Sequence, residues 1–284
     1  MDDYQAQLSK DREQIYNFIL NNLPKGDSLV EKSVRYSVFP SKKGHLLRPL
    51  LLMKTAESYG ISRDLFMPYV SAMEIMHVAS LVLDDLPSMD NSSMRRGKPS
   101  CHTKFGVAIA ELASHYLIAL GQELILTGKG GNEKNHIILR NVNQAIKQVI
   151  HGQEQDLYDT QDMNLDQMLD FYRSKTGTFF ALATTTGQIL DNSRFTEFES
   201  LKEFGYNAGI AYQLNDDLLD VTSTEEFMGK PLNQDIRKKT PITILGLEKV
   251  LELRQRYVER AKSNLIGVKF TENYLNNLAD VLFT

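Results

Sequence analysis

Three acidic residues and two arginines are crowded into one short stretch, LDDLPSMDNSSMRRG. Asp84, Asp85 and Asp90 come first, and Arg95 and Arg96 follow them. Hard cations such as Mg²⁺ prefer carboxylate oxygens and usually complete their coordination with phosphates of the substrate. Arginine binds phosphate through a planar pair of N–H groups. The stretch therefore predicts a site for metal ions and phosphates, and a solvated loop of mutually paired charges is the alternative.

A second acidic cluster, NDDLLD, lies more than a hundred residues further along the chain. On a helix, Asp216 and Asp220 are four residues apart and Asp217 and Asp220 are three apart, so the carboxylates share a face. Like charges gathered on one face are unfavourable unless cations offset them. A solvated helix face would usually alternate acids with lysines, so this cluster also predicts metal binding.

Other polar residues recur in otherwise apolar windows. His77 lies two helical turns before the first aspartate, where it could donate to a phosphate, although a lone histidine is more often a core residue. Arg48 stands beside a proline near a helix start, a favourable place for an anion. Gln153 and Asp156 lie one turn apart, which fits a hydrogen bond on the helix face as well as it fits a site.

Cationic and polar residues also surround the second cluster in sequence. Lys175 and Thr176 precede a glycine in a stretch that otherwise has a buried character, and Gln213 stands just before the cluster. Lys230 follows it in MGKP. A single lysine is normally a surface residue, but together these side chains would provide donors around a diphosphate.

The elements that must position these residues are expected to be helices. No proline lies between Pro99 and Pro231, and this region is rich in good helix formers. Apolar residues recur at three- and four-residue steps, whereas strand patterns and hairpin turn pairs are weak. We predict a single all-α domain over residues 1–284, a bundle of long helices around a common centre. The expected helices end near Pro24 and near Gly60, run from Met67 to Leu83, and cover about 102–127, 133–158, 165–190, 196–221, 241–264 and 270–282.

Composition limits the kinds of partner and compartment. The 32 Lys and Arg against 36 Asp and Glu give a formal charge of −4, so the chain has no global field for nucleic acid or an anionic membrane. The one cysteine, Cys101, excludes an intrachain disulfide and fits a reducing compartment. The N-terminal stretch is charged, and polar residues interrupt the apolar stretch Leu112–Leu126. We expect a soluble cytoplasmic protein without a secretory signal or a membrane span.

The motifs, taken in their order, resemble those of the trans-isoprenyl diphosphate synthases of the polyprenyl synthetase family. The resemblance runs from about Gly44 to Pro241: DDLPSMD is similar to the first aspartate-rich motif, and NDDLLD to the second. The segments EIMH, RRG, GQEQDL, SKTG, AYQ and MGKP also match. The resemblance implies an all-α fold of the isoprenoid synthase type, usually a homodimer, with the two aspartate motifs facing across a central cavity.

The resemblance also implies a role for each matching residue. The ligands of a Mg²⁺ cluster on the allylic diphosphate would be Asp84, Asp85, Asp90, Asp216, Asp217 and Asp220. The allylic diphosphate would also be bound by Arg95, Lys175 and Lys230. The diphosphate of isopentenyl diphosphate would be bound by Arg48, His77, Arg96 and, in place of a family lysine, His45. Thr176 and Gln213 would face the reacting carbons.

Three departures from the family pattern bear on activity. His45 replaces a lysine, and histidine is only partly charged at neutral pH, which weakens the isopentenyl diphosphate site. Leu112-Ala113 stands where the family often has Gly-Asp, and the segment Asp235–Thr240 is shorter than usual. Two other readings stay open: a terpene cyclase, which needs no isopentenyl site, and a non-catalytic subunit of a heteromeric synthase.

Product length is argued from the helix that leads into the first motif. Ala79, five residues before Asp84, stands where a bulky aromatic residue in the family tends to stop chain growth early. A small side chain there leaves room, because a missing ring enlarges an apolar pocket. The sequence therefore favours a C20 product, geranylgeranyl diphosphate, over the C15 product farnesyl diphosphate or a longer chain.

Overall fold

The protein is all-α, as predicted. The computed structural model describes residues 2–38, 46–158, 162–191, 197–222 and 239–282 of the 284. Apart from two strands of two residues each, every regular element in these ranges is a helix. The chain forms two compact units, Met1–Met53 with Ser62–His136 and Lys54–Ile61 with Ile137–Thr284. The single domain over residues 1–284 stays a prediction.

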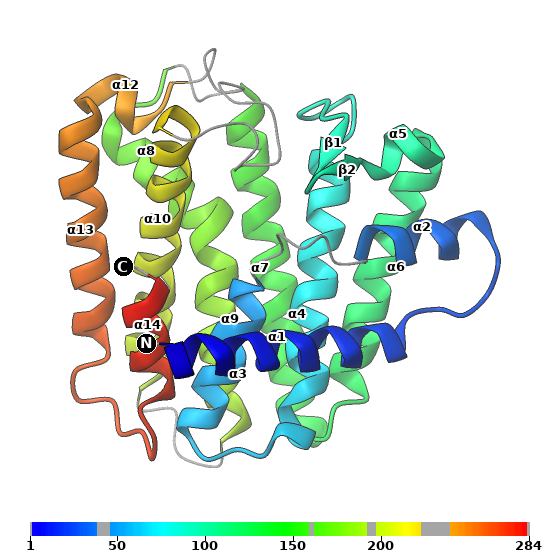
Figure 1. Cartoon of the computed structure of the whole chain (residues 1–284), viewed down its shortest axis with the longest axis horizontal. Helices are drawn as coiled ribbons and strands as arrows, with labels where there is room; N and C mark the ends of the chain where they lie inside the picture. Colours follow the sequence, from blue (N-terminus) through cyan, green and yellow to red (C-terminus); the bar gives the residue numbers. More distant parts are fainter. Residues whose placement is uncertain (1, 39–45, 159–161, 192–196, 223–238, 283–284) are drawn as a thin grey trace. The chain divides into compact units, whose positions relative to one another are not determined.

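The first unit is built on one buried helix, α4. Its elements are α1 (Asp2–Asn22), α2 (Leu29–Val38), the start of α3 (Leu47–Ser58), α4 (Arg63–Asp84), β1 (Met94–Arg95), β2 (Lys98–Pro99), α5 (Cys101–Phe105), α6 (Val107–Leu126) and the start of α7 (Asn132–Tyr158). Helix α4 packs against α6 and α1 (Figure 1). Gly121 permits the close approach of α6, because a Cβ atom there would lie 2.6 Å from Met76 Cγ. The apolar run that precedes the first aspartate motif is therefore core.

A short hairpin carries the two arginines of the first motif. Arg95 pairs with Lys98 across β1 and β2, and the connecting residues Arg96 and Gly97 have φ of +52° and +79°. Two successive residues at positive φ are typical of the tight turns that match strand twist. The backbone therefore turns at Arg96, so the neighbouring side chains of Arg95 and Arg96 take different directions.

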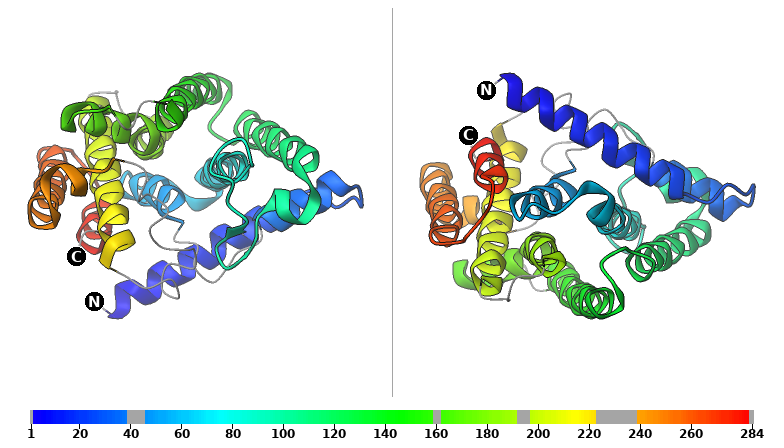
Figure 2. Two further views of the ribbon diagram at one scale, coloured as in Figure 1. Left: turned by 90° about the horizontal axis from the view of Figure 1, so that it is seen from above. Right: turned by 90° about the horizontal axis from the view of Figure 1, so that it is seen from below.

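The second unit is organised around α10. Its elements are the rest of α3 and α7, α8 (Leu165–Tyr172), the π-helical turn η1 (Arg173–Gly177), α9 (Thr178–Leu190), α10 (Phe198–Thr222), α12 (Pro241–Leu245), α13 (Leu247–Asn264) and α14 (Tyr274–Leu282). Helix α10 packs against α9, η1 and α13 (Figure 2). Glycines allow this contact, because a Cβ atom on Gly205 would lie 2.4 Å from Ala181 Cα and one on Gly209 2.5 Å from Gly177 Cα.

The predicted helices are present, but the structure divides several of them. The segment expected over 102–127 is interrupted at Gly106, with φ of +88°, and the one over 241–264 at Gly246, with φ of +81°. Glycine adopts this left-handed conformation without a Cβ clash, so the chain turns there. Helix α2 was not predicted, and α8, η1 and α9 together fill 165–190.

Two helices of the first unit pass a simple test for membrane spans. By length and composition, α4 and α6 are long and apolar enough to cross a bilayer. In the tested window, 72% of α4 is buried inside the protein, as expected of a core helix, against 39% of α6. The absence of a membrane span therefore stays a prediction.

Candidate functional site

The first aspartate motif is shaped by the end of α4 and the loop that follows it. Asp84 is the last residue of α4, and Asp85 caps the helix. The backbone N–H of Asp90 donates to the Asp84 carbonyl at 2.9 Å, and the N–H of Ser92 donates to the Asp85 carbonyl at 3.1 Å. Asp90 thus comes back to the end of the helix, which stops before Pro87.

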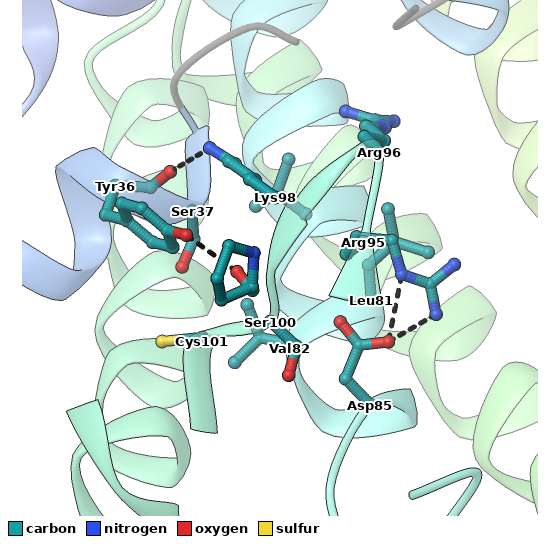
Figure 3. Close-up of a pocket in the computed structure, with 12 residues that line it drawn as sticks. Tyr36, Ser37, Leu81, Val82, Asp85, Arg95, Arg96, Lys98, Ser100 and Cys101 are labelled. Atoms are coloured by element: carbon teal, nitrogen blue, oxygen red, sulfur yellow. Dashed lines mark hydrogen bonds and ion pairs between the residues drawn. The ribbon is translucent and has the colours of Figure 1, made fainter. Parts of the chain in front are cut away.

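Arg95 is held by the first motif itself. Its Nε and Nη2 atoms donate to Asp85 Oδ1 at 2.9 and 2.5 Å (Figure 3). Asp85 is only 2% exposed, and burial raises the pKa of its carboxyl, although the hydrogen bonds from Arg95 act in the opposite direction. Arg95 therefore offsets the charge of one of the three carboxylates.

Arg48 and His77 form a second pair of site residues in the first unit. Arg48 Nη1 lies 3.2 Å from His77 Nε2. Because a guanidinium can only donate, Nε2 accepts, and a neutral ring carries its proton on Nδ1. Burial, together with Arg48, Arg96 and Arg95, holds the pKa of His77 well below its usual value. His77 is therefore a neutral residue with one N–H to donate.

A buried carboxylate, Glu74, accompanies this pair. Arg96 Nη1 lies 3.8 Å from Glu74 Oε1, and Glu74 is 2% exposed. Burial raises the pKa of Glu74 to about 7, although Arg96 and Arg48 act to lower it. Glu74 Oε2 has no hydrogen-bond partner within the described chain. Glu74 has no role predicted from the sequence, although the EIMH segment places it three residues before His77, on the same side of α4.

The second aspartate motif lies near the end of α10. Asp217 and Asp220 are buried, each 8% exposed, whereas Asp216 is more accessible. Tyr172 Oη donates to Asp217 Oδ2 at 2.6 Å. Asp220 Oδ1 is buried, and no hydrogen-bond partner for it exists in the part of the chain that is described. The role of Tyr172 was missed, because a tyrosine in an apolar helix reads as core and nothing in the sequence links it to a residue 45 positions away.

The other predicted residues of the second unit lie in pairs around the π-helical turn. Lys175 Nζ donates to Asp156, and Thr176 Oγ1 donates to Gln213 Oε1 at 2.9 Å. Asp156 thus pairs with Lys175 rather than with Gln153, which has buried amide atoms without a partner in the described residues. π-Helical turns are rare and occur frequently at functional sites.

Some predicted residues cannot be placed. His45, Lys230 and residues 235–238 lie outside the described residues. Among residues 2–38, 46–158, 162–191, 197–222 and 239–282, no group of three histidine, cysteine, aspartate or glutamate side chains converges closely enough to hold a metal ion. The metal-ligand roles of the six aspartates therefore stay predictions.

Comparisons with known proteins agree with these features. The family model described as polyprenyl synthetase matches residues 27–269. A geranylgeranyl diphosphate synthase of Cyanophora paradoxa is 32% identical over 267 residues, covering 90% of this chain and 88% of that protein. A farnesyl diphosphate synthase of Bacillus subtilis (strain 168) is 31% identical over 264 residues, with coverage of 90% and 88%.

The crystal structure of a geranyltransferase from Helicobacter pylori, complexed with magnesium and isoprenyl diphosphate, has the same fold. Its TM-score is 0.87 at 24% identity, and the match covers 98% of this chain and 95% of that one. The predicted fold class is thereby confirmed. From its motifs, its helical fold and these relatives, the chain belongs to the polyprenyl synthetase family and is a prenyltransferase.

Proposed function

We propose that this prenyltransferase condenses isopentenyl diphosphate with an allylic diphosphate in a Mg²⁺-dependent reaction, and that geranylgeranyl diphosphate is its main product. The observation that carries the proposal is the burial of two carboxylates, Asp217 and Asp220, three residues apart on α10. Buried like charges are costly unless a cation offsets them, and one Asp220 oxygen has no donor within the described residues. Relatives named as geranylgeranyl diphosphate synthases favour the C20 product, and those named as farnesyl diphosphate synthases keep C15 as the alternative.

The residues present fit magnesium. Carboxylate oxygens are its preferred protein ligands, and the Helicobacter pylori geranyltransferase was crystallised with magnesium and an isoprenyl diphosphate. Bound magnesium would stabilise the negative charge of the departing diphosphate. The residues proposed to hold a cluster of these ions are Asp84, Asp85, Asp90, Asp216, Asp217 and Asp220.

The chain's other residues then divide between the two substrates. Arg95 and Lys175 supply fixed positive charge to the allylic diphosphate as its C–O bond breaks. Arg48, Arg96 and the Nδ1–H of His77 bind the diphosphate of isopentenyl diphosphate, so that its double bond is held close to the allylic cation. The Thr176 and Gln213 pair lies beside the reacting carbons, where exclusion of water protects the cation. No side-chain nucleophile is needed.

A product assay tests this function. The purified protein is incubated with Mg²⁺ and geranyl or farnesyl diphosphate, with and without isopentenyl diphosphate, and the products are identified by mass spectrometry. We expect elongation only when both substrates are present, with C20 dominant. A hydrocarbon or alcohol formed without isopentenyl diphosphate would indicate a terpene cyclase. Turnover that requires another subunit would indicate a non-catalytic partner.

A matched pair of variants links the activity to α10. Asp220→Asn removes the charge of the buried carboxylate, and we expect its rate at limiting Mg²⁺ to fall at least about tenfold. Asp166→Asn makes the same chemical change at an exposed position on α8 and is expected to keep the wild-type rate. Equal rates in the two variants would remove Asp220 from the proposed metal site.

The proposed partner is a second copy of the chain. Leu112, Tyr116 and Leu126 lie on one side of α6 with 53%, 38% and 49% of their surfaces exposed, an apolar surface that a homodimer would cover. Light scattering after gel filtration should give twice the chain mass. Leu112→Arg should give a monomer, whereas Leu251→Arg, at a 45% exposed position on α13, should not. A cytoplasmic location stays a prediction from the sequence.

A further inference from the structure

A second pocket of the first unit lies beside the hairpin, and the proposed reaction does not use it. It is bounded by the end of α1, the start of the connection to α2, α2 itself, β2 and α5. It shares two lining residues, Tyr36 and Lys98, with the pocket of Figure 3, which contains Asp85, Arg95 and Arg96. A ligand in this second pocket would therefore touch the segment that positions both arginines.

The lining of this pocket is strongly cationic. Lys25, Lys32, Arg35, Lys98 and Lys104 all contribute to it, and none of its described lining residues is acidic. The chain as a whole carries a formal charge of −4, so this cluster of positive charge is a local feature. Such a local excess of one sign raises the concentration of anions near the surface.

One ion pair at this pocket compensates the positive charge only weakly. Lys32 Nζ lies 3.7 Å from Asp27, which is 92% exposed. An ion pair in that position contributes little, because water screens it. Arg35, in contrast, is fixed in place by hydrogen bonds from Nη1 to the carbonyl oxygens of Pro24 and Gly26 at 2.6 and 2.7 Å. The pocket thus holds an ordered guanidinium beside several lysines.

Two of the lysines are held close together by one aromatic ring. Lys98 Nζ lies 4.3 Å and Lys104 Nζ 4.0 Å from the centroid of the Tyr36 ring. Burial, Arg96 and Lys104 lower the pKa of Lys98, so like charges repel at this point. Lys98 also donates to the Tyr36 carbonyl at 2.5 Å (Figure 3). A bound anion would relieve this repulsion.

The rest of the pocket is apolar. Leu23 and Pro24 line it beside Leu20, whose surface is 36% exposed, and Phe105 packs edge-on against Tyr36 with ring centroids 5.3 Å apart. Apolar surface next to a group of cations matches a ligand with an anionic head and an apolar chain. A small inorganic anion would leave the apolar wall unused.

We propose that this pocket binds a prenyl diphosphate as a second ligand, with the diphosphate among the lysines and the chain along Leu20, Leu23 and Phe105. The identification of the chain as prenyl rests on the proposed function, whereas the affinity for an amphiphilic anion does not. Because Lys98 precedes Pro99 on the strand that leads away from Arg96, occupancy would restrain the hairpin.

Binding measurements on the full chain test the proposal without turnover. The probe is farnesyl thiolodiphosphate, which does not ionise readily, titrated calorimetrically into three proteins. The pocket variant combines Lys25→Gln, Lys32→Gln and Lys104→Gln, and the control combines Lys129→Gln, Lys147→Gln and Lys249→Gln, exposed lysines outside the pocket with the same total charge change. We expect two binding events in the wild type, of which the one that belongs to this pocket is at least tenfold weaker in the pocket variant and unchanged in the control.

Further arms identify the ligand class. Inorganic pyrophosphate and farnesol, titrated separately, are expected to bind the pocket at least tenfold more weakly than the probe. Three results would overturn the proposal: equal probe affinity in all three proteins, equal binding of pyrophosphate and probe, or pocket-dependent binding to phosphatidylglycerol vesicles without any pocket-dependent binding of the probe. A protein that binds the probe in this pocket but makes no product would contradict the proposed prenyltransfer reaction and still support the second binding site.

Discussion

The Tyr172 hydroxyl donates a 2.6 Å hydrogen bond to Oδ2 of Asp217, joining the end of α8 to the aspartate motif of α10. Both side chains are buried, at 5% and 8% exposure. A donor of this kind fixes the rotamer of the carboxylate. Tyr172 thus acts as a positioning residue for a proposed metal ligand.

Tyr172→Phe should lower the affinity for Mg²⁺ strongly and the folding free energy only slightly. Loss of one buried hydrogen bond costs about 1 kcal/mol of folding free energy. Loss of a residue that orients a metal ligand typically lowers metal affinity about 10–100-fold. The Mg²⁺ concentration that gives the half-maximal rate should therefore rise at least about tenfold. Tyr158→Phe, at an 81% exposed position on α7, is the control. An unchanged Mg²⁺ dependence in Tyr172→Phe would show that Asp217 does not need this donor.

Gly209→Ala should disturb the second unit at the contact between α10 and the π-helical turn. The new Cβ atom would lie 2.5 Å from Gly177 Cα, and overpacking of this kind costs about 1–3 kcal/mol. Gly209 lies one turn before Gln213, so the shift should also break the Thr176–Gln213 hydrogen bond and lower the rate. Urea unfolding and steady-state kinetics measure the two effects.

Gly205→Ala provides the comparison for this experiment. Its Cβ atom would meet the backbone of Ala181 at 2.4 Å, one turn further from the Thr176–Gln213 pair. We expect similar destabilisation but a rate close to that of the wild type under conditions where both variants are folded. If both variants lose activity equally, the loss is caused by general destabilisation of α10 and not by the broken Thr176–Gln213 hydrogen bond.

The charged residues of the site could be predicted from the sequence because they interrupt apolar windows. Asp84, Asp85, Asp216 and Asp217 stand out for that reason, and helical spacing alone places Asp216 and Asp220 on one side of α10. Glu74 and Tyr172 could not be assigned in this way. Each acts through a contact that depends on tertiary structure, and each is compatible with an ordinary core position.

The hairpin that carries the arginines also escaped prediction, for a reason of backbone chemistry. Sequence patterns for two-residue hairpin turns depend on Asn-Gly or Asp-Gly, since asparagine and aspartate tolerate positive φ. Here Arg96 takes that position with φ of +52°, followed by Gly97. An arginine in a left-handed conformation costs local energy, so tertiary contacts such as that between Arg95 and Asp85 must hold it.

Ser80→Phe should shorten the product. The length determinant predicted from the sequence is Ala79, but this residue is fully buried and its carbonyl accepts a hydrogen bond from Ser114 of α6 at 3.0 Å. Ser80 lies on the accessible side of α4 with His77 and Asp84. An aromatic ring there should shift the main product from C20 to C15, as read by mass spectrometry. Ala79→Tyr is the comparison. If only that variant makes a shorter product, Ala79 rather than Ser80 sets the product length.

Glu74 should make the stability of the protein depend on pH. Its pKa rises from an ordinary 4.5 to about 7 in the fold. Between these values the folded protein keeps a proton that the unfolded chain has released, so the free energy of unfolding falls as pH rises. The difference in pKa corresponds to a loss of at most about 3 kcal/mol. Glu74→Gln removes the titration, so its stability relative to the wild type should be greater at pH 8 than at pH 5.

Urea unfolding of wild type and Glu74→Gln at both pH values measures this difference directly. We expect the stability of the variant relative to the wild type to rise by about 1–3 kcal/mol between pH 5 and pH 8, since burial of the charge is the dominant cause of the raised pKa. Glu13→Gln, at an exposed position on α1, controls for the change of residue type and should show no such rise. Parallel pH profiles for Glu74→Gln and the wild type would mean that Arg96 and Arg48 keep Glu74 ionised throughout, and its carboxylate would then be a permanent counter-charge in the proposed isopentenyl diphosphate site.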